Sequence, residues 1–132
     1  VEKEDMTLVL EPLNTRVSEA RSHKNYFLQY PEPGFELTRR VGSEKVKVLY
    51  DVYHMQLMAG NVIRTLEKNI DQLGYIHLAD VPGSHEPGTG ELNHVNILKA
   101  LDCMGYAGFV GFELLPSETD EKAIEAIKRI WI

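Results

Sequence analysis

The sequence predicts an α/β fold in which four parallel strands alternate with helices, half the number of βα units in a (β/α)8 barrel. Three observations support this prediction. Four short apolar runs are separated by segments with helical spacing. Each run carries a potential metal ligand toward its C-terminal end, where barrel enzymes place their active sites. The chain has 132 residues, which suits one domain but is far short of the about 250 residues of a complete barrel.

The four apolar runs are the predicted strands. Apolar residues occupy adjacent positions within them, as at Val48 and Leu49, instead of alternating with polar ones. This pattern is typical of a parallel sheet that is covered on both faces. In chain order the runs are Thr7–Asn14, Val46–His54, Gly74–Asp80 and Phe109–Pro116.

Helical segments are expected between the runs, and the first two end at glycines. Phe35–Val41 is short, and Gly42 fits its C-cap. Asn61–Leu73 has apolar residues at helical spacing, and Gly74 is expected to end it. The order strand, loop, helix therefore repeats along the chain.

The last two helices follow the third and fourth runs. Val95–Met104 comes after Asn93 and contains Cys103, the only cysteine, so no intrachain disulfide is possible. We expect this thiol to lie in the buried core. Asp120–Ile130 follows a short polar stretch that supplies its N-cap.

Two long loops follow predicted strands, on the side of the sheet where function is expected. They are Pro12–Gly34 and Asp80–His94, and loops of such length are more often functional than not. Within the second, the segment HEPGTGEL is expected to form a tight loop over the mouth of the site. Its acidic residues Glu86 and Glu91 are candidates for orienting ligands or closing the pocket.

The candidate metal ligands are Glu11, Asp51, His77 and Glu113, one from each run. Three carboxylates and one imidazole suit a single divalent cation, and the oxygen-rich set favours Mn, Mg or Co. Glu11 and Glu113 stand in otherwise apolar runs, where an unpaired carboxylate costs much to bury. Each residue alone also fits a paired core acid or a hydrogen-bonded core histidine. Their recurrence at one structural level in all four runs favours the metal site.

Three further residues are candidates for substrate binding: His54, Asp80 and Glu86 of the long loop. His54 follows Asp51 by three residues, in the predicted loop just past the second strand. In that position it either contacts a substrate hydroxyl or caps the loop. Asp80 comes in the turn after the third run, where it is either a substrate contact or a turn residue.

Charge and hydropathy exclude some classes of partner. The net charge is −6, whereas a nucleic-acid-binding protein needs a basic face. The apolar runs are far shorter than the roughly 20 residues that span a bilayer. No signal peptide is apparent, so a cytoplasmic location is expected. The chain enters an apolar run almost at once, as a piece of a longer polypeptide would.

Several segments together resemble one protein family. LVLEPLN, DVYHMQLMAGN, YIHLADVPGSHEPGTGELN and GYAGFVGFELLP are similar to the C-terminal half of hydroxypyruvate isomerase-like members of the xylose isomerase-like TIM-barrel superfamily. The resemblance covers nearly the whole chain. It implies one partial TIM-barrel domain over residues 1–132, equivalent to strands five to eight.

The resemblance also implies roles for the candidate residues. It implies that the four candidate ligands bind one divalent metal and that Glu11 and Glu113 form the acid/base pair. It further implies that His54 contacts substrate, as its counterpart does in related ketose 3-epimerases. Some hydroxypyruvate isomerases carry Gln at the position of His77, so this histidine leans toward the sugar epimerases.

The predicted function is therefore a metal-dependent isomerase of a small hydroxy-carbonyl compound, such as hydroxypyruvate or a ketose. A cation on adjacent carbonyl and hydroxyl oxygens acidifies the C–H between them, and two carboxylates remove and return the proton. The same residues would serve a ketose 3-epimerase or an inosose dehydratase-like enzyme. A half-barrel that is truncated or self-assembling and has no catalysis of its own also fits the sequence. A phosphodiester-cleaving repair endonuclease fits less well, because the acidic balance disfavours it.

The expected partners follow from the fold. Besides a small-molecule substrate, a half-barrel with two open sheet edges is expected to pair with another polypeptide. That polypeptide is either a second copy, giving a homo-oligomer, or a complementing N-terminal half. No nucleic acid and no membrane is expected as a partner.

Overall fold

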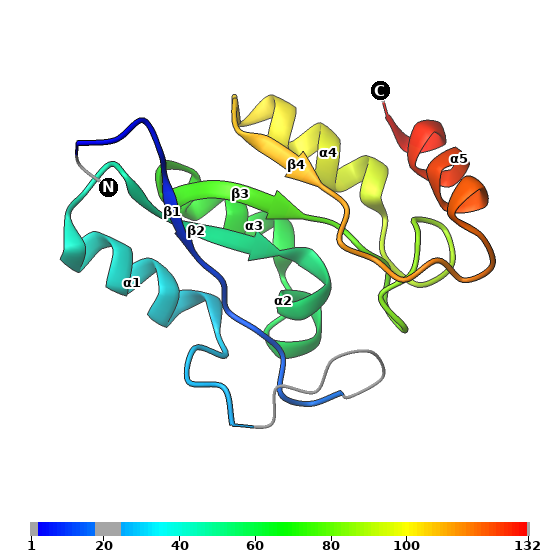
Figure 1. Cartoon of the computed structure of the whole chain (residues 1–132), viewed down its shortest axis with the longest axis horizontal. Helices are drawn as coiled ribbons and strands as arrows, with labels where there is room; N and C mark the ends of the chain where they lie inside the picture. The colour runs from blue at the N-terminus through cyan, green and yellow to red at the C-terminus, as the bar shows by residue number, and fades with distance from the viewer. Residues whose placement is uncertain (1–2, 18–24, 132) are drawn as a thin grey trace.

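The computed structural model describes residues 3–17 and 25–131, so residues 18–24 of the predicted Pro12–Gly34 loop lie outside it. Four strands form one sheet in the order β1-β2-β3-β4, and every neighbouring pair is parallel (Figure 1). This confirms the predicted α/β architecture of half a barrel. The strands are β1 (Leu8–Leu10), β2 (Val46–Asp51), β3 (Leu73–His77) and β4 (Phe109–Gly111).

Helices follow each strand, and their ends have local causes. In α1 a proline opens the helix, and Gly42 ends it in the left-handed conformation with φ 68°. The side chain of Thr119 accepts a hydrogen bond from the backbone N–H of Lys122 and caps α5. The helices are α1 (Pro31–Val41), α2 (Val52–Met58), α3 (Val62–Lys68), α4 (His94–Cys103) and α5 (Asp120–Ile130), with a 3-10 turn at Ile70–Gln72.

Helix α2 was not predicted, and it changes the surroundings of His54. Asp51 is both the last residue of β2 and the N-cap of α2, because its side chain accepts a hydrogen bond from the His54 N–H at 3.0 Å. His54 therefore lies in the first turn of a helix and not in a loop. The apolar run continues unchanged from the strand into the helix, so hydropathy alone does not mark the boundary.

The predicted helix Asn61–Leu73 is too long at its C-terminal end. The helix α3 ends at Lys68, and Leu73 already belongs to β3. Gly74 lies within that strand instead of capping a helix. A Cβ at Gly74 would lie 2.7 Å from the Cβ of Lys47 and 2.9 Å from Val9 Cγ1, so the glycine is needed where three strands approach closely.

The prediction of a buried Cys103 is also wrong, because the thiol is exposed. Ile97 and Leu101 are the residues of α4 that reach the core. Cys103 is two positions beyond Leu101, a rotation of roughly 200° around the helix, and so faces the opposite side.

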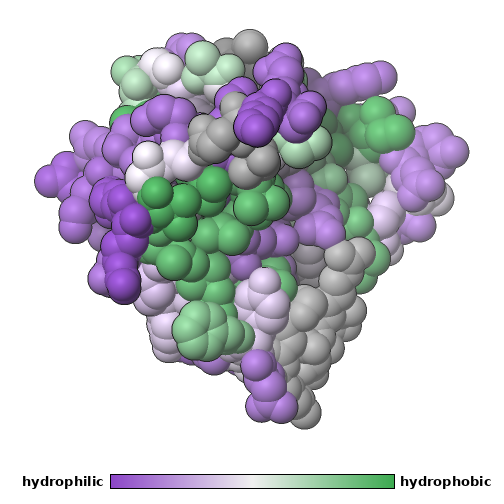
Figure 2. Space-filling model, turned by 60° about the vertical axis from the view of Figure 1, so that its left-hand side comes forward, coloured by the Kyte–Doolittle hydropathy of each residue, from purple (hydrophilic) through white to green (hydrophobic). Residues whose placement is uncertain are grey.

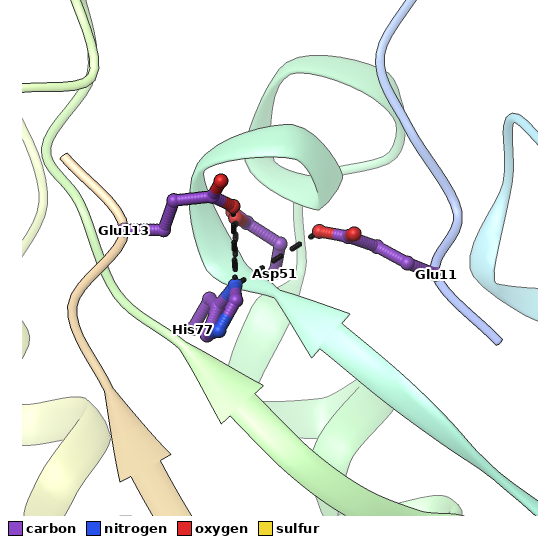
Figure 3. Close-up of side chains that lie close together, drawn as sticks. All are labelled: Glu11, Asp51, His77 and Glu113. Carbon is purple, nitrogen blue, oxygen red and sulfur yellow. Dashed lines mark ion pairs between the residues drawn. The ribbon is translucent and has the colours of Figure 1, made fainter. Parts of the chain in front are cut away.

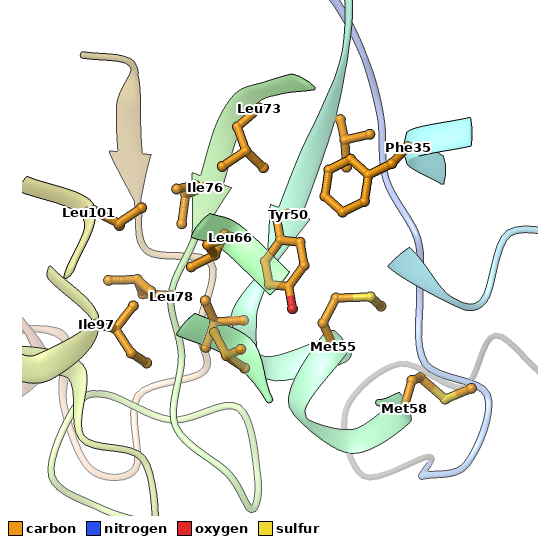
Figure 4. Packing of buried hydrophobic residues seen from close by; sticks show 13 residues of the cluster. Phe35, Tyr50, Met55, Met58, Leu66, Leu73, Ile76, Leu78, Ile97 and Leu101 are labelled. Atoms are coloured by element: carbon orange, nitrogen blue, oxygen red, sulfur yellow. The ribbon is translucent and has the colours of Figure 1, made fainter. Parts of the chain in front are cut away.

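The hydrophobic core lies between one face of the sheet and helices α1 to α4. Its members include Val48, Tyr50 and Ile76 from the strands, with helical residues packed on them (Figure 4). Neighbouring residues of a strand point to opposite faces. Because Tyr50 and Ile76 point into this core, Asp51 and His77 must point out of the other face.

Both outer strands of the sheet have an unpaired edge among the described residues. Leu8 of β1 is 51% exposed and Phe109 of β4 is 76% exposed. Figure 2 shows hydrophobic residues gathered on the surface between hydrophilic ones. Within the described part of the chain, no helix has both the length and the apolar character needed to cross a bilayer.

Candidate metal centre

The four candidate ligands lie at the C-terminal ends of the four strands. Asp51 and His77 are the last residues of β2 and β3 and are register partners in the sheet. Glu11 directly follows β1, and Glu113 lies two residues beyond β4. Because the strands are parallel, all four residues reach the same edge of the sheet.

The four side chains converge on one point. One ligand atom from each residue lies within 4.8 Å of the others (Figure 3). The Nδ1 atom of His77 is 3.3 Å from a Glu113 carboxylate oxygen, 3.8 Å from one of Asp51 and 4.0 Å from one of Glu11. The fold therefore brings together the four residues that the sequence indicated, and their binding of a metal remains a prediction.

The electrostatics of the cluster fit a cation. Burial of Asp51, reinforced by the nearby carboxylates of Glu11 and Glu113, raises its pKa to about 8, although the His54 N–H opposes the shift. Burial lowers the pKa of His77, with Glu113 acting in the opposite direction. A neutral imidazole can offer a lone pair to a metal. A divalent ion among these groups would offset both the burial and the repulsion that raise the pKa of Asp51.

Asn14 fixes the orientation of His54 beside this cluster. The Asn14 Nδ2 amide is 2.9 Å from His54 Nδ1, while the Asn14 Oδ1 accepts a hydrogen bond from the Val17 N–H at 3.0 Å. The amide therefore donates to Nδ1, which places the proton of the neutral ring on Nε2. Sequence reasoning missed this function of Asn14, since nothing in the run LVLEPLN separates it from an ordinary turn residue.

A small cavity opens beside the cluster and includes the buried His54. Its lining combines Asp51 and Glu113 of the ligand set with residues of α2, the β3–α4 loop and the segment after β4. Ser84 of that loop was not predicted as a site residue, and it adopts a left-handed conformation with φ 57°. The lining residues are Asp51, Tyr53, His54, Ser84, Glu113, Leu114 and Leu115.

Asp80 and Glu86 lie outside the four-residue cluster. The carboxylate of Asp80 is fully buried and accepts hydrogen bonds from backbone N–H groups of its own loop, among them those of Gly88 and Gly90 at 2.9 Å. Glu86 accepts a hydrogen bond from the Ser117 N–H at 2.9 Å. A role for either residue in substrate binding remains a prediction, while Glu91 of the same loop is exposed.

Parallel βα units in this order define the class: the chain is half of a TIM barrel. The candidate metal centre lies at the end of the sheet where such barrels carry their active sites. The model of the family described as "Xylose isomerase-like TIM barrel" matches residues 1–130. The chain belongs to this family.

Two named relatives are isomerases. The chain is 37% identical over 111 residues to 2-oxo-tetronate isomerase of Cupriavidus necator, covering 84% of this chain and 41% of that protein. It is 34% identical over 131 residues to hydroxypyruvate isomerase of Escherichia coli, covering 92% of this chain and 45% of that protein. The chain thus spans about half the length of the curated relatives it matches.

Solved structures also match this chain over about half of their own length or less. The structure titled AP endonuclease, family 2, from Brucella melitensis matches with a TM-score of 0.85 and 34% identity, over 93% of this chain and 46% of that one. An L-ribulose 3-epimerase matches with a TM-score of 0.68 and 27% identity, over 92% of this chain and 39% of that one.

Proposed function

We propose that the chain carries the metal-binding and acid/base part of the active site of an isomerase for small hydroxy-carbonyl compounds. The observation that carries this proposal is the convergence of Glu11, Asp51, His77 and Glu113 within 4.8 Å at the C-terminal ends of four parallel strands. The names of the isomerase relatives support the reaction class. Hydroxypyruvate and small 2-oxo sugar acids are the first substrates to test.

The four side chains would hold one Mn, Mg or Co ion through three carboxylates and an imidazole. When bound, the ion would engage adjacent carbonyl and hydroxyl oxygens of the substrate and acidify the C–H between them. The site supplies the rest of the chemistry through its own residues.

Glu11 and Glu113 would carry out the proton transfer. They follow the two outer strands and approach the site from opposite sides, with Asp51 and His77 between them (Figure 3). One glutamate takes the proton from the hydroxyl-bearing carbon, and the other delivers a proton to the former carbonyl carbon. The hydroxyl proton moves to the former carbonyl oxygen, so the product is an isomer with no gain or loss of atoms.

His54 would orient the substrate. It lines the cavity next to Glu113, and Asn14 holds its ring in the tautomer with the proton on Nε2. That N–H would donate a hydrogen bond to a substrate oxygen. The backbone N–H of His54 donates a hydrogen bond to the Asp51 side chain, so His54 is held next to the four candidate ligands.

A 3-epimerase is the second candidate. Its support is the likeness to the L-ribulose 3-epimerase structure and an imidazole in the ligand set. In this case both glutamates would act at the same carbon from opposite faces. An endonuclease reaction has less support, because the chain has a net charge of −6 and DNA binding needs a basic face.

Two measurements test the proposal. Titration of Mn²⁺ followed by electron paramagnetic resonance should show one site per chain, whose affinity is much weaker in Glu113→Gln and unchanged in Glu36→Gln, an exposed glutamate of α1. Proton NMR of hydroxypyruvate or a ketose in D₂O should then show deuterium entering at carbon with the wild type and the control variant, but not with Glu113→Gln. Normal Mn²⁺ affinity in Glu113→Gln would remove this residue from the site and refute the arrangement.

A further inference from the structure

The β3–α4 loop is fastened to the segment that carries Glu113. The Leu115 N–H donates to the Ser84 carbonyl at 2.8 Å, and His85 Nδ1 donates to the Leu115 carbonyl at 2.6 Å. Glu86 accepts hydrogen bonds from both the backbone N–H and the hydroxyl of Ser117. Three consecutive loop residues therefore hold the chain just beyond β4.

A buried carboxylate gives this loop a fixed shape. Asp80 Oδ2 accepts from the N–H groups of Gly88 and Gly90, each at 2.9 Å. Its Oδ1 accepts from Val81 at 2.9 Å and from Leu92 at 3.0 Å. A Cβ at Gly90 would lie 2.0 Å from the Val81 carbonyl oxygen, so only glycine allows this close approach. The loop is thus wrapped around one ionisable side chain.

Glu113 needs such external support because its own strand is short. Strand β4 has three residues and, among the described strands, pairs only with β3. The strand ends at Gly111, two residues before Glu113. The Glu113 side chain is also 39% exposed, in contrast to 3% for Asp51. Sheet hydrogen bonding therefore fixes Asp51 but not Glu113.

We propose that Glu86 is a positioning residue, which sets the location of Glu113 through its two hydrogen bonds to Ser117. Asp80 holds the loop in the shape that lets Glu86 reach that segment. This assignment rests on the proposed metal site, since Glu113 is positioned there as a ligand. Glu86 itself is 5% exposed and engaged with Ser117, so it acts through Glu113 and not by touching substrate.

A double-mutant cycle on Mn²⁺ affinity tests the assignment. Glu86→Ala should weaken Mn²⁺ binding roughly 10- to 100-fold, the size typical for residues that orient a metal ligand. In a Glu113→Gln background the same change should have less than about a threefold effect, because the ligand it positions is gone. In a Glu11→Gln background the full effect should remain, and Glu36→Ala on the exposed side of α1 should leave affinity unchanged.

Ser117→Ala provides the second variant. It removes the hydroxyl bond to Glu86 and keeps the backbone bond, so it should move affinity in the same direction by a smaller factor even if Glu86→Ala does not fold. Equal effects in the Glu11→Gln and Glu113→Gln backgrounds would show a general loss of stability and overturn the positioning role. Unchanged Mn²⁺ affinity together with weaker substrate binding would make Glu86 a substrate contact instead. Absence of Mn²⁺ binding by the wild type would refute the proposed function itself.

Discussion

The stability of the metal-free protein should fall as pH rises, because of Asp51. Its pKa is raised from 3.8 to about 8 by burial and by Glu11 and Glu113. The folded protein therefore keeps a proton on Asp51 that the unfolded chain loses near pH 4. In this window the native state binds more protons than the unfolded state, so stability is present at low pH and is lost as pH approaches 8.

The size of the effect follows from the shift. One pKa unit corresponds to about 1.4 kcal/mol, so a rise from 3.8 to about 8 amounts to on the order of 5 kcal/mol. This is a large part of the roughly 5–15 kcal/mol that stabilises a typical domain. The lowered pKa of His77 acts with the opposite sign, since its stability contribution appears as pH rises.

Asp51→Asn isolates the contribution of Asp51 from that of His77. Asparagine keeps a side-chain oxygen for the His54 N–H and remains a good N-cap, but it has no proton to lose. Urea denaturation should be measured with EDTA at steps from pH 4 to pH 8. The free energy of unfolding of the variant should increase relative to that of the wild type as pH rises. With saturating Mn²⁺ the wild type should show the reverse trend, because the metal requires the ionised carboxylate. Parallel curves for the wild type and the variant in EDTA would refute the reasoning.

Three other predictions concern the core, the thiol and the sheet edges. Leu66→Ala should cost about 2–5 kcal/mol in urea denaturation because the residue is fully buried, whereas Ile63→Ala on the exposed side of the same helix should cost much less. Cys103 should react with a thiol reagent in the folded protein as fast as in urea, and strong protection would contradict its exposed position. The chain should sediment above its monomer mass of 15.0 kDa through its open edges, and Phe109→Lys should reduce that association. A sharp monomer peak at high concentration, with cooperative unfolding, would contradict this expectation.

The strands and the convergence of the candidate ligands could be predicted because their signals are local. An apolar run marks each strand, and an acid or histidine at its C-terminal end is visible without the fold. Parallel topology then brings Glu11, Asp51, His77 and Glu113 together, since each ends an equivalent unit. Helix α5 was predicted with its observed bounds, because its N-cap residue and its helical spacing both lie within one segment.

The errors arose where a residue serves two elements, and some contacts were not predicted because the partners are backbone groups. Asp51 ends a strand and caps α2, so the apolar run gave no sign of the helix. Leu73 continues the spacing of α3 but belongs to β3. Asp80 accepts hydrogen bonds from the backbone N–H groups of Val81 and Leu92, and Glu86 accepts one from that of Ser117. Any sequence can supply such groups, so no residue pattern reveals the pairing.

Each βα unit contributes one residue of the proposed metal site, and this division has a practical consequence for splitting the molecule. A cut near Gly105, a residue in the left-handed conformation after α4, would leave Glu113 on one peptide and the other three ligands on its partner. Neither peptide could form the complete coordination sphere. Reassembly of the two peptides would then respond to the concentration of free divalent metal, and a fluorescent pair attached at the cut would report it.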